Sequence, residues 1–212
     1  MRFGFLYQHP WIYDLALYGL YHGDPHARFK QVANEIPKGA SVVDLCAGTS
    51  FLFRQLQEKC PNYQAFDINP RLVKHLQKRG INAHSFDVRT DAIPQADVVT
   101  MCSSLYHFHP NCKDIIQQMQ NSAREKVIVL EPVHNAKNSR FAFMRWLGAQ
   151  AGIVDGKINE FYFSPDAFQD LIHHTSGFQK VAPAGDGRDM LAIFDGHAST
   201  TSEPSPQTPA YS

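Results

Sequence analysis

The sequence of 212 residues has few cysteines, no long apolar run and no surplus of either charge. Its four cysteines form no C-x-x-C pair and no framework typical of secreted proteins, so we expect a reducing, cytoplasmic location. No run of roughly 18 apolar residues occurs, which argues against a membrane span and a membrane partner. The N-terminus lacks a small-residue cleavage site and is interrupted by Asp14, so we expect no signal peptide. The 20 basic residues balance the 20 acidic ones, which argues against nucleic-acid binding.

Glycine is scarce in the loop that follows the first predicted strand. Residues 42–50 read VVDLCAGTS, with Gly48 as the single glycine where dinucleotide-binding loops commonly carry three. The loop is therefore either a degenerate phosphate cradle or a loop suited to a ligand without phosphate.

Apolar strand-like segments alternate with helix-like segments along most of the chain. Asn69 and Pro70 are typical of a helix start, and Gly80 of its end. We predict helices over residues 11–23, 24–37, 50–59, 69–80, 112–123, 139–152 and 164–177, strands over 40–46, 63–68, 82–88, 96–102 and 126–133, and an antiparallel hairpin over 178–196.

This order predicts an α/β fold with a doubly wound, mostly parallel, seven-stranded sheet of Rossmann-like type. The last strand is expected to be antiparallel, and helices should cover both faces. We divide the chain into an N-terminal helical cap (1–37), a ligand-binding domain (38–196) with an insertion near the substrate site (135–163), and a disordered tail (197–212) that is polar and proline-rich.

Aspartates end three successive predicted strands. Asp44 ends the first, Asp67 lies 19 residues beyond Gly48 at the end of the second, and Asp87 follows the third. Sheets of this kind bind ligands at the carboxyl ends of their strands, and a carboxylate at the position of Asp67 suits two ribose hydroxyls. The alternative is that these residues are N-caps or turn residues, or that Asp44 secures its own loop.

Together these features resemble the class I S-adenosylmethionine-dependent methyltransferases over roughly residues 25–195. The first motif of that family, D-x-G-x-G-x-G, reads here as DLCAGTS from Asp44 to Ser50. The resemblance implies that Asp67 binds the ribose, that Asp87 lies by the adenine amino group, and that Gly48 lets the backbone approach the methionine moiety. The implied cofactor-binding set comprises Asp44, Cys46, Ala47, Gly48, Thr49, Asp67, Ile68, Asp87, Val88, Cys102, Ser103 and Ser104.

The missing glycines have a physical explanation. S-adenosylmethionine carries no phosphate, so a continuous nest of backbone N–H groups is not required. The small residues Cys46 and Ser50 suit a tight loop, provided that neither position needs a positive φ. A dinucleotide fold with a degenerate loop is the alternative. Cys46 and Cys102 either lie near the sulfonium or are simply small buried side chains.

The segment after the fourth strand, LYHFHP at residues 105–110, lies over the transferred methyl group in the family. Its histidines suit proton transfer near neutral pH, and His107 is our first candidate for a general base. The full set of catalytic candidates is Tyr106, His107, His109, Glu131 and His134. The alternatives are that no base is used, or that His107 packs on the adenosine or caps the next helix. These side chains include metal-ligand types, but no known ligand spacing occurs, so we expect no metal.

The acceptor is expected to be a small molecule. The segment differs from the Asn/Asp-Pro-Pro-aromatic motif of nucleic-acid and amide N-methylating members, and no double-glutamate loop of the protein-arginine type occurs. Aromatic residues that form either a roof over the site or ordinary core are Phe3, Phe5, Tyr7, Trp11, Tyr13, Tyr18, Phe141, Phe143, Trp146, Phe161, Tyr162 and Phe163. We predict methyl transfer by in-line displacement. The alternatives are cyclisation or elimination with the same cofactor, and a non-catalytic regulatory module.

Overall fold

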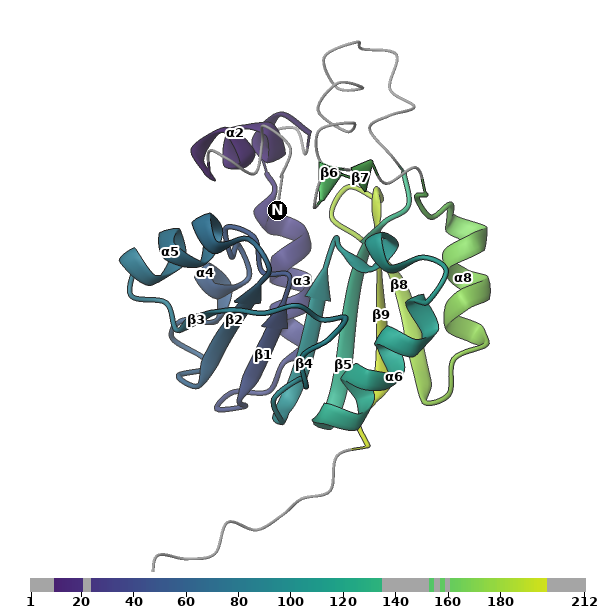
Figure 1. Cartoon of the computed structure of the whole chain (residues 1–212). Helices are drawn as coiled ribbons and strands as arrows, with labels where there is room; N and C mark the ends of the chain where they lie inside the picture. Colours follow the sequence, from purple (N-terminus) through teal and green to yellow (C-terminus); the bar gives the residue numbers. More distant parts are fainter. Residues whose placement is uncertain (1–9, 21–23, 135–152, 155–156, 159–160, 198–212) are drawn as a thin grey trace, which may run out of the picture.

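The computed structural model describes residues 10–20, 24–134, 153–154, 157–158 and 161–197 (Figure 1). The segments outside these ranges include the predicted helix 139–152, most of the insertion and nearly all of the tail, so those predictions lie outside the described residues. Within the described ranges, no helix is both long and apolar enough to span a bilayer.

A seven-stranded sheet forms the centre of the molecule, which confirms the predicted fold class. Its order is β3 (Ala83–Ser85), β2 (Tyr63–Asp67), β1 (Val42–Leu45), β4 (Ala96–Cys102), β5 (Ala123–Pro132), β9 (Asp189–Asp195) and β8 (Phe178–Ala184). Strand β9 pairs antiparallel with both of its neighbours, and the pairs from β3 to β5 are parallel.

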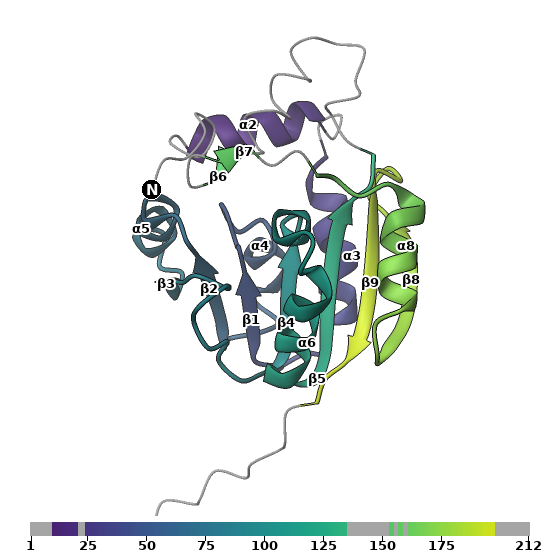
Figure 2. The ribbon, with the colours of Figure 1, turned by 45° about the vertical axis from the view of Figure 1, so that its right-hand side comes forward.

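Helices cover both faces of the sheet (Figures 1 and 2). One face packs against α3 (His26–Glu35), α4 (Phe53–Leu56) and α5 (Pro70–Lys78), and the other against α6 (Cys112–Ser122) and α8 (Pro165–His173). Successive side chains of a strand point to opposite faces, so Val42 and Val43 belong to different hydrophobic cores. The near-continuous apolar strands follow from this two-sided burial.

The helix ends follow their sequence signals, with one exception. Asn69 caps α5 by accepting a hydrogen bond from the Arg71 amide, and Gly80 adopts φ 75° after its last turn. The helix predicted over residues 50–59 is shorter: α4 comprises Phe53–Leu56 alone. In this segment i→i−3 bonds, from Gln55 N to Leu52 O and from Lys59 N to Leu56 O, alternate with the α-helical bonds from Gln57 N to Phe53 O and from Cys60 N to Leu56 O.

A separate layer lies across the carboxyl ends of the strands (Figure 2). It contains the helix α2 (Pro10–Leu20) and the small antiparallel pair β6 (Ile153–Val154) and β7 (Lys157–Ile158). The carboxyl edge of the sheet, where ligands of such folds bind, is therefore covered by this layer.

Candidate active site

A pocket opens where β1 and β4 end and meets the N-terminal part of α3. It is lined by Arg28, Phe29, Asp44, Cys46, Ala47, Gly48, Thr49, Phe51, Leu52, Cys102 and Ser103. Seven of these residues belong to the cofactor-binding set predicted from the sequence. The hydroxyl oxygen of Thr49 is buried in the wall and has no hydrogen-bond partner within the described ranges.

The glycine-poor loop adopts the backbone of a glycine-rich one. Cys46, Gly48 and Ser50 have φ of 56°, 60° and 54°, so every second residue is left-handed. The proviso that neither Cys46 nor Ser50 needs a positive φ is therefore wrong. A left-handed non-glycine residue costs about 1–2 kcal/mol, because its Cβ approaches a carbonyl oxygen. The loop keeps the shape of D-x-G-x-G-x-G at an energetic cost.

Asp44 secures the loop from below. Its Oδ1 accepts a hydrogen bond from Thr100 Oγ1 on β4 at 2.9 Å, and its Oδ2 accepts one from the Tyr63 hydroxyl on β2. Ser50 Oγ lies 2.7 Å from the same Tyr63 hydroxyl. Burial raises the pKa of Asp44 to about 6. This chain of contacts holds the strained Ser50 to two strands.

Asp67 does not line the pocket, but it contacts the pocket residue Gly48. The Gly48 amide donates to Asp67 Oδ2 at 2.9 Å, and the Asn69 amide donates to Oδ1 at 2.8 Å. Burial raises the pKa of Asp67, although these two amides partly offset the effect. Each carboxylate oxygen has a second lone pair, so Asp67 retains capacity for further donors.

The residues expected around adenine lie further along the edge of the sheet. Asp87 pairs with Arg89, whose Nε and Nη2 lie 2.8 and 2.7 Å from its two carboxylate oxygens. These hydrogen bonds from Arg89 lower the pKa of Asp87. Val88 is buried and Ile68 is half-buried. None of these three predicted residues lines the pocket described above.

Arg28 is the main site residue that the sequence analysis missed. It is 2% exposed, and its Nη1 donates to Asp189 Oδ1 and to Ser103 Oγ, both at 2.9 Å. Asp189 begins β9, 161 residues away, and is completely buried. The sequence feature that could have identified Arg28 is its position on the apolar side of α3, four residues before Val32.

The predicted catalytic residues do not form one cluster. Glu131 is completely buried beneath the short 3₁₀ helix η1 (Leu105–Phe108), and its Oε2 accepts the Leu105 amide at 2.8 Å. Burial raises the pKa of Glu131 well above its ordinary value. His134 is exposed, and its amide donates to Arg188 O at the turn between β8 and β9.

Aromatic rings surround η1 instead. His107 is half-buried with its ring centroid 4.1 Å from that of Tyr106, which stacks on Tyr162 at 4.8 Å. His109 is exposed and stacks on Phe161 at 3.7 Å. Burial lowers the pKa of His107 to about 4, so this imidazole is neutral at physiological pH. The surroundings of η1 are thus built from packed rings.

The pocket thiols and the histidines show no metal-binding arrangement. Burial raises the pKa of both Cys46 and Cys102 well above its ordinary value, so these thiols stay protonated. Ser104 Oγ donates to the Cys102 carbonyl at 3.2 Å. In the part of the chain that the structure describes, no group of three or more His, Cys, Asp or Glu side chains is placed to hold a metal ion.

Comparison with known proteins identifies the family. The family model described as a methyltransferase domain matches residues 21–182. The chain belongs to this methyltransferase family. This confirms the resemblance to class I S-adenosylmethionine-dependent methyltransferases. No curated protein sequence matches the chain.

Several solved methyltransferases share the fold. A putative methyltransferase from Haloferax volcanii, solved in complex with the Trm112 activator, has a TM-score of 0.68 at 10% identity, over 93% of this chain and 100% of that one. A possible histamine N-methyltransferase from Thermotoga maritima has a TM-score of 0.60 at 14% identity, over 88% and 97%. An O-methyltransferase family 2 protein from Planctomyces limnophilus, complexed with apigenin, has a TM-score of 0.59 at 13% identity, over 90% of this methyltransferase chain. The chain spans 62% of that relative's length.

Proposed function

We propose that this methyltransferase moves a methyl group from S-adenosylmethionine to a small-molecule acceptor by in-line displacement. The observation that carries the proposal is a pocket lined by Arg28 and Gly48, with the Asp67 carboxylate bound to the Gly48 amide. The Gly48 amide, which a phosphate-binding loop would offer to its ligand, donates to the Asp67 carboxylate. A carboxylate at that place suits hydroxyl and ammonium donors and opposes a phosphate.

The chemistry of the pocket walls fits this cofactor better than a dinucleotide. Asp44, a wall residue of the pocket, would face a pyrophosphate with a charge of the same sign. A methionine moiety is instead a zwitterion beside a sulfonium, so it suits a wall with the Asp44 carboxylate and the guanidinium of Arg28. The Thr49 hydroxyl, which has no partner among the described residues, supplies a further polar contact.

We assign roles from these positions. Arg28 binds the methionine carboxylate, and Asp67 binds the ribose hydroxyls. Ile68, Asp87 and Val88 flank the adenine, as the family resemblance implies. The remaining cofactor contacts come from Asp44, Cys46, Ala47, Gly48, Thr49, Cys102, Ser103 and Ser104.

The cofactor supplies an electrophilic methyl group, and the protein supplies alignment and exclusion of water. Cys46 and Cys102 line the pocket as neutral thiols, since burial raises the pKa of both, so they do not compete with the acceptor as nucleophiles. His107 is neutral and can accept a proton from an acceptor held against η1. We propose His107 as the base, while Tyr106 and His109 shape the acceptor site.

Glu131 and His134 take other positions in this proposal. Glu131 holds the backbone of η1 from beneath, which positions Tyr106 and His107. His134 lies at the turn between β8 and β9 and has no assigned role in the reaction.

Two observations support the acceptor class and the compartment. One relative with this fold was solved with apigenin, and another is a mitomycin 7-O-methyltransferase, so the fold accommodates small molecules. All four cysteines are free thiols, which supports the reducing, cytoplasmic location that we propose.

The test is incubation with methyl-labelled S-adenosylmethionine and a metabolite extract. Transfer of label to a small molecule, with release of S-adenosylhomocysteine, is the expected outcome. Consumption of the cofactor without label transfer would favour cyclisation or elimination, and binding without consumption would favour a regulatory module. Cofactor retained after purification, detected by mass spectrometry of denatured protein, tests the binding assignment separately.

A further inference from the structure

The outer side of α2 is apolar and faces away from the domain. Trp11 is 67% exposed and Leu15 is 64% exposed, and the exposed Gly19 continues this row at the i+4 spacing of one helix face. These two side chains are the exposed large hydrophobic residues of the part of the chain that the structure describes. The row carries no charged residue.

The inner side of α2 is polar and fixed to the domain. Asp14 lies 3.5 Å from Arg54 Nη2, and the Tyr18 hydroxyl lies 2.9 Å from His26 Nε2. Tyr18 also meets the ring of Phe51 edge-on, at a centroid distance of 6.2 Å. Because these contacts set the rotation of α2, the apolar row is held outward.

A basic row lies beside this helix, on α5. Arg71, Lys74, His75, Lys78 and Arg79 follow the spacing of one helix face, and α5 contains no acidic residue. Within the described ranges, Arg71, Lys74 and Lys78 form no ion pair. Arg79 donates to Thr49 O at 3.2 Å.

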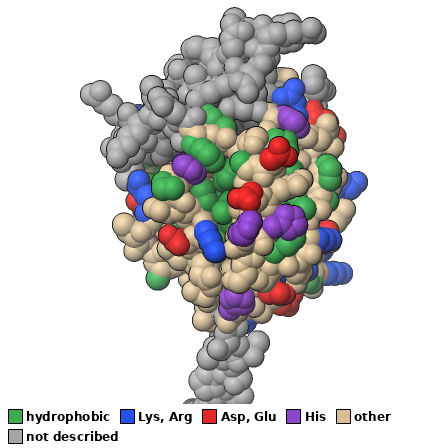
Figure 3. All heavy atoms as spheres, turned by 90° about the vertical axis from the view of Figure 1, so that its right-hand side faces the viewer, with side chains coloured by type: hydrophobic (Ala, Val, Ile, Leu, Met, Phe, Trp, Pro, Cys, Tyr) green, Lys and Arg blue, Asp and Glu red, His purple; other side chains and the backbone are tan. Residues whose placement is uncertain are grey.

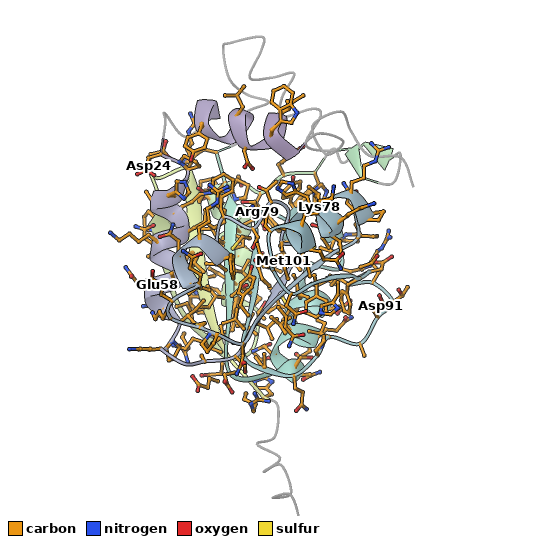
Figure 4. All side chains as sticks on the ribbon, turned by 90° about the vertical axis from the view of Figure 1, so that its left-hand side faces the viewer. Asp24, Glu58, Lys78, Arg79, Asp91 and Met101 are labelled. Atoms are coloured by element: carbon orange, nitrogen blue, oxygen red, sulfur yellow. The ribbon has the colours of Figure 1, made fainter. Side chains whose placement is uncertain are left out.

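The two rows belong to one side of the molecule. Lys78 and Arg79 lie below α2, on the flank where α5 runs, whereas Glu58 and Asp91 lie lower on the same flank (Figure 4). Burial lowers the pKa of His75 on α5, and the neighbouring charge of Arg79 lowers it further. The charge of Asp14 on α2 acts in the opposite direction and raises this pKa, so α2 lies within electrostatic reach of α5. On the opposite flank, around α8, acidic and basic side chains are interspersed (Figure 3).

We propose that α2 and α5 form a docking surface for an anionic lipid bilayer. Helices that lie in a membrane interface bury an apolar face about 5–10 Å into the boundary of headgroups and acyl chains. Cationic side chains that lie about one helix diameter, roughly 10 Å, behind such an apolar face are then at the level of the lipid phosphates. An apolar row in front of a basic row fits a bilayer better than nucleic acid. A nucleic-acid surface would instead place its cations in direct contact with the phosphates. The surface needs no membrane-spanning segment. It departs from the sequence-based expectation of no membrane partner, because that expectation rested on the absence of a long apolar run and did not consider a helix that lies in the interface.

The test is co-sedimentation of the full chain with vesicles of phosphatidylcholine alone and of phosphatidylcholine with 30% phosphatidylglycerol, a composition typical of such assays and of the order that gives a strongly negative surface. We expect binding to the anionic vesicles that weakens as salt increases. Lys74→Ala with Lys78→Ala should lower the partition coefficient about 30-fold, at roughly a factor of 5 for each cation. Trp11→Ser with Leu15→Ser should lower it about 10-fold or more, since apolar burial is lost.

Matched controls separate this surface from general charge. Lys30→Ala with Lys113→Ala removes two exposed lysines from α3 and α6 and should leave partitioning unchanged. The wild-type tryptophan emission should shift to shorter wavelength on anionic vesicles, and Trp11→Phe should abolish the shift. Equal binding of all variants, or binding to neutral vesicles alone, would overturn the proposal. Tighter binding to duplex DNA or RNA than to vesicles would also overturn it. The same holds if the protein binds no vesicles and forms a dimer that the double variant Trp11→Ser with Leu15→Ser dissociates.

Discussion

The two regions that we propose for the cofactor and the acceptor are built by different means. The proposed cofactor side is held by buried hydrogen bonds that link β1, β2 and β4 to one another and α3 to β9, with Asp44, Asp67 and Arg28 as the central members. The proposed acceptor side is held by ring packing around η1, where Tyr106 stacks on Tyr162 and His109 on Phe161. Hydrogen-bonded charges specify one geometry, whereas stacked rings tolerate several. The contrast fits a site in which the cofactor is constant and the acceptor varies.

The largest effect that tests this contrast is expected at Arg28. Arg28→Ala removes the guanidinium that binds the buried Asp189 carboxylate and should cost about 3–5 kcal/mol in the free energy of unfolding, measured with urea. Arg124→Ala, which removes the half-exposed pair with Asp97, should cost about 1 kcal/mol or less.

A double variant separates folding from binding at this position. Arg28→Met with Asp189→Leu should recover most of the stability, because the two charges are removed together. Its affinity for S-adenosylhomocysteine in calorimetry should stay about 10- to 100-fold below that of the wild type. Wild-type affinity in the double variant would remove Arg28 from the binding assignment.

Asp67 gives the next largest effect. Asp67→Ala should lower the affinity for S-adenosylhomocysteine roughly 30- to 1000-fold, about 2–4 kcal/mol, because it removes the acceptor for the ribose hydroxyls. The Gly48 and Asn69 amides also lose their partner, so the loop should be less ordered. Asp97→Ala, at the opposite end of the sheet, is the control. If NADH binds the wild type more tightly than S-adenosylhomocysteine, the dinucleotide alternative is correct.

His107 tests the acceptor side. His107→Ala should lower turnover by roughly 100-fold or more while cofactor affinity stays nearly unchanged. Burial lowers the pKa of His107 to about 4, so the neutral base is present throughout pH 5–8, and kcat should not fall on its account within that range. A loss of cofactor affinity would assign His107 to packing on the adenosine. Near-normal turnover would reject both roles.

The smallest effects are expected at the two left-handed residues of the loop. Cys46→Gly should stabilise the fold by about 1 kcal/mol, because glycine adopts φ 56° without a Cβ clash. Ser50→Gly should change stability little, since the relief of strain is offset by loss of the contact with Tyr63, worth about 1 kcal/mol. Thermal unfolding of each single variant, compared with that of the wild type, measures the two changes in stability. Equal effects would show that the Tyr63 contact contributes nothing.

The sequence predicted the parts of this structure that depend on local pattern. The alternation of apolar segments gave the sheet, and Asn69 and Gly80 marked the ends of α5, because these signals act within a few residues. The positions of Asp44 near the end of β1 and Asp67 at the end of β2 follow the predicted strand ends, and the carboxyl ends of parallel strands share one edge of the sheet.

Other features depend on contacts that no local pattern contains. The pairing of Arg28 with Asp189 joins residues 161 positions apart, and a buried arginine on an amphipathic helix resembles an exposed one in sequence. The positive φ of Cys46 and Ser50 is imposed by the loop and sustained by Tyr63 and Asp44, against the intrinsic preference of both residues. The later start of the predicted helix 50–59 follows from the same loop, since Ser50 has a left-handed conformation and lies before α4.

The bond between Arg28 and Asp189 also bears on how the chain can be divided. The sequence-based division places a boundary between residues 37 and 38, which separates a helical cap from the ligand-binding domain. The cap nevertheless carries Arg28, whose guanidinium pairs with Asp189 in β9. A fragment that begins at residue 38 would contain every strand of the sheet but would lack the arginine that binds Asp189. A shortened chain for expression or crystallisation trials should therefore keep α3.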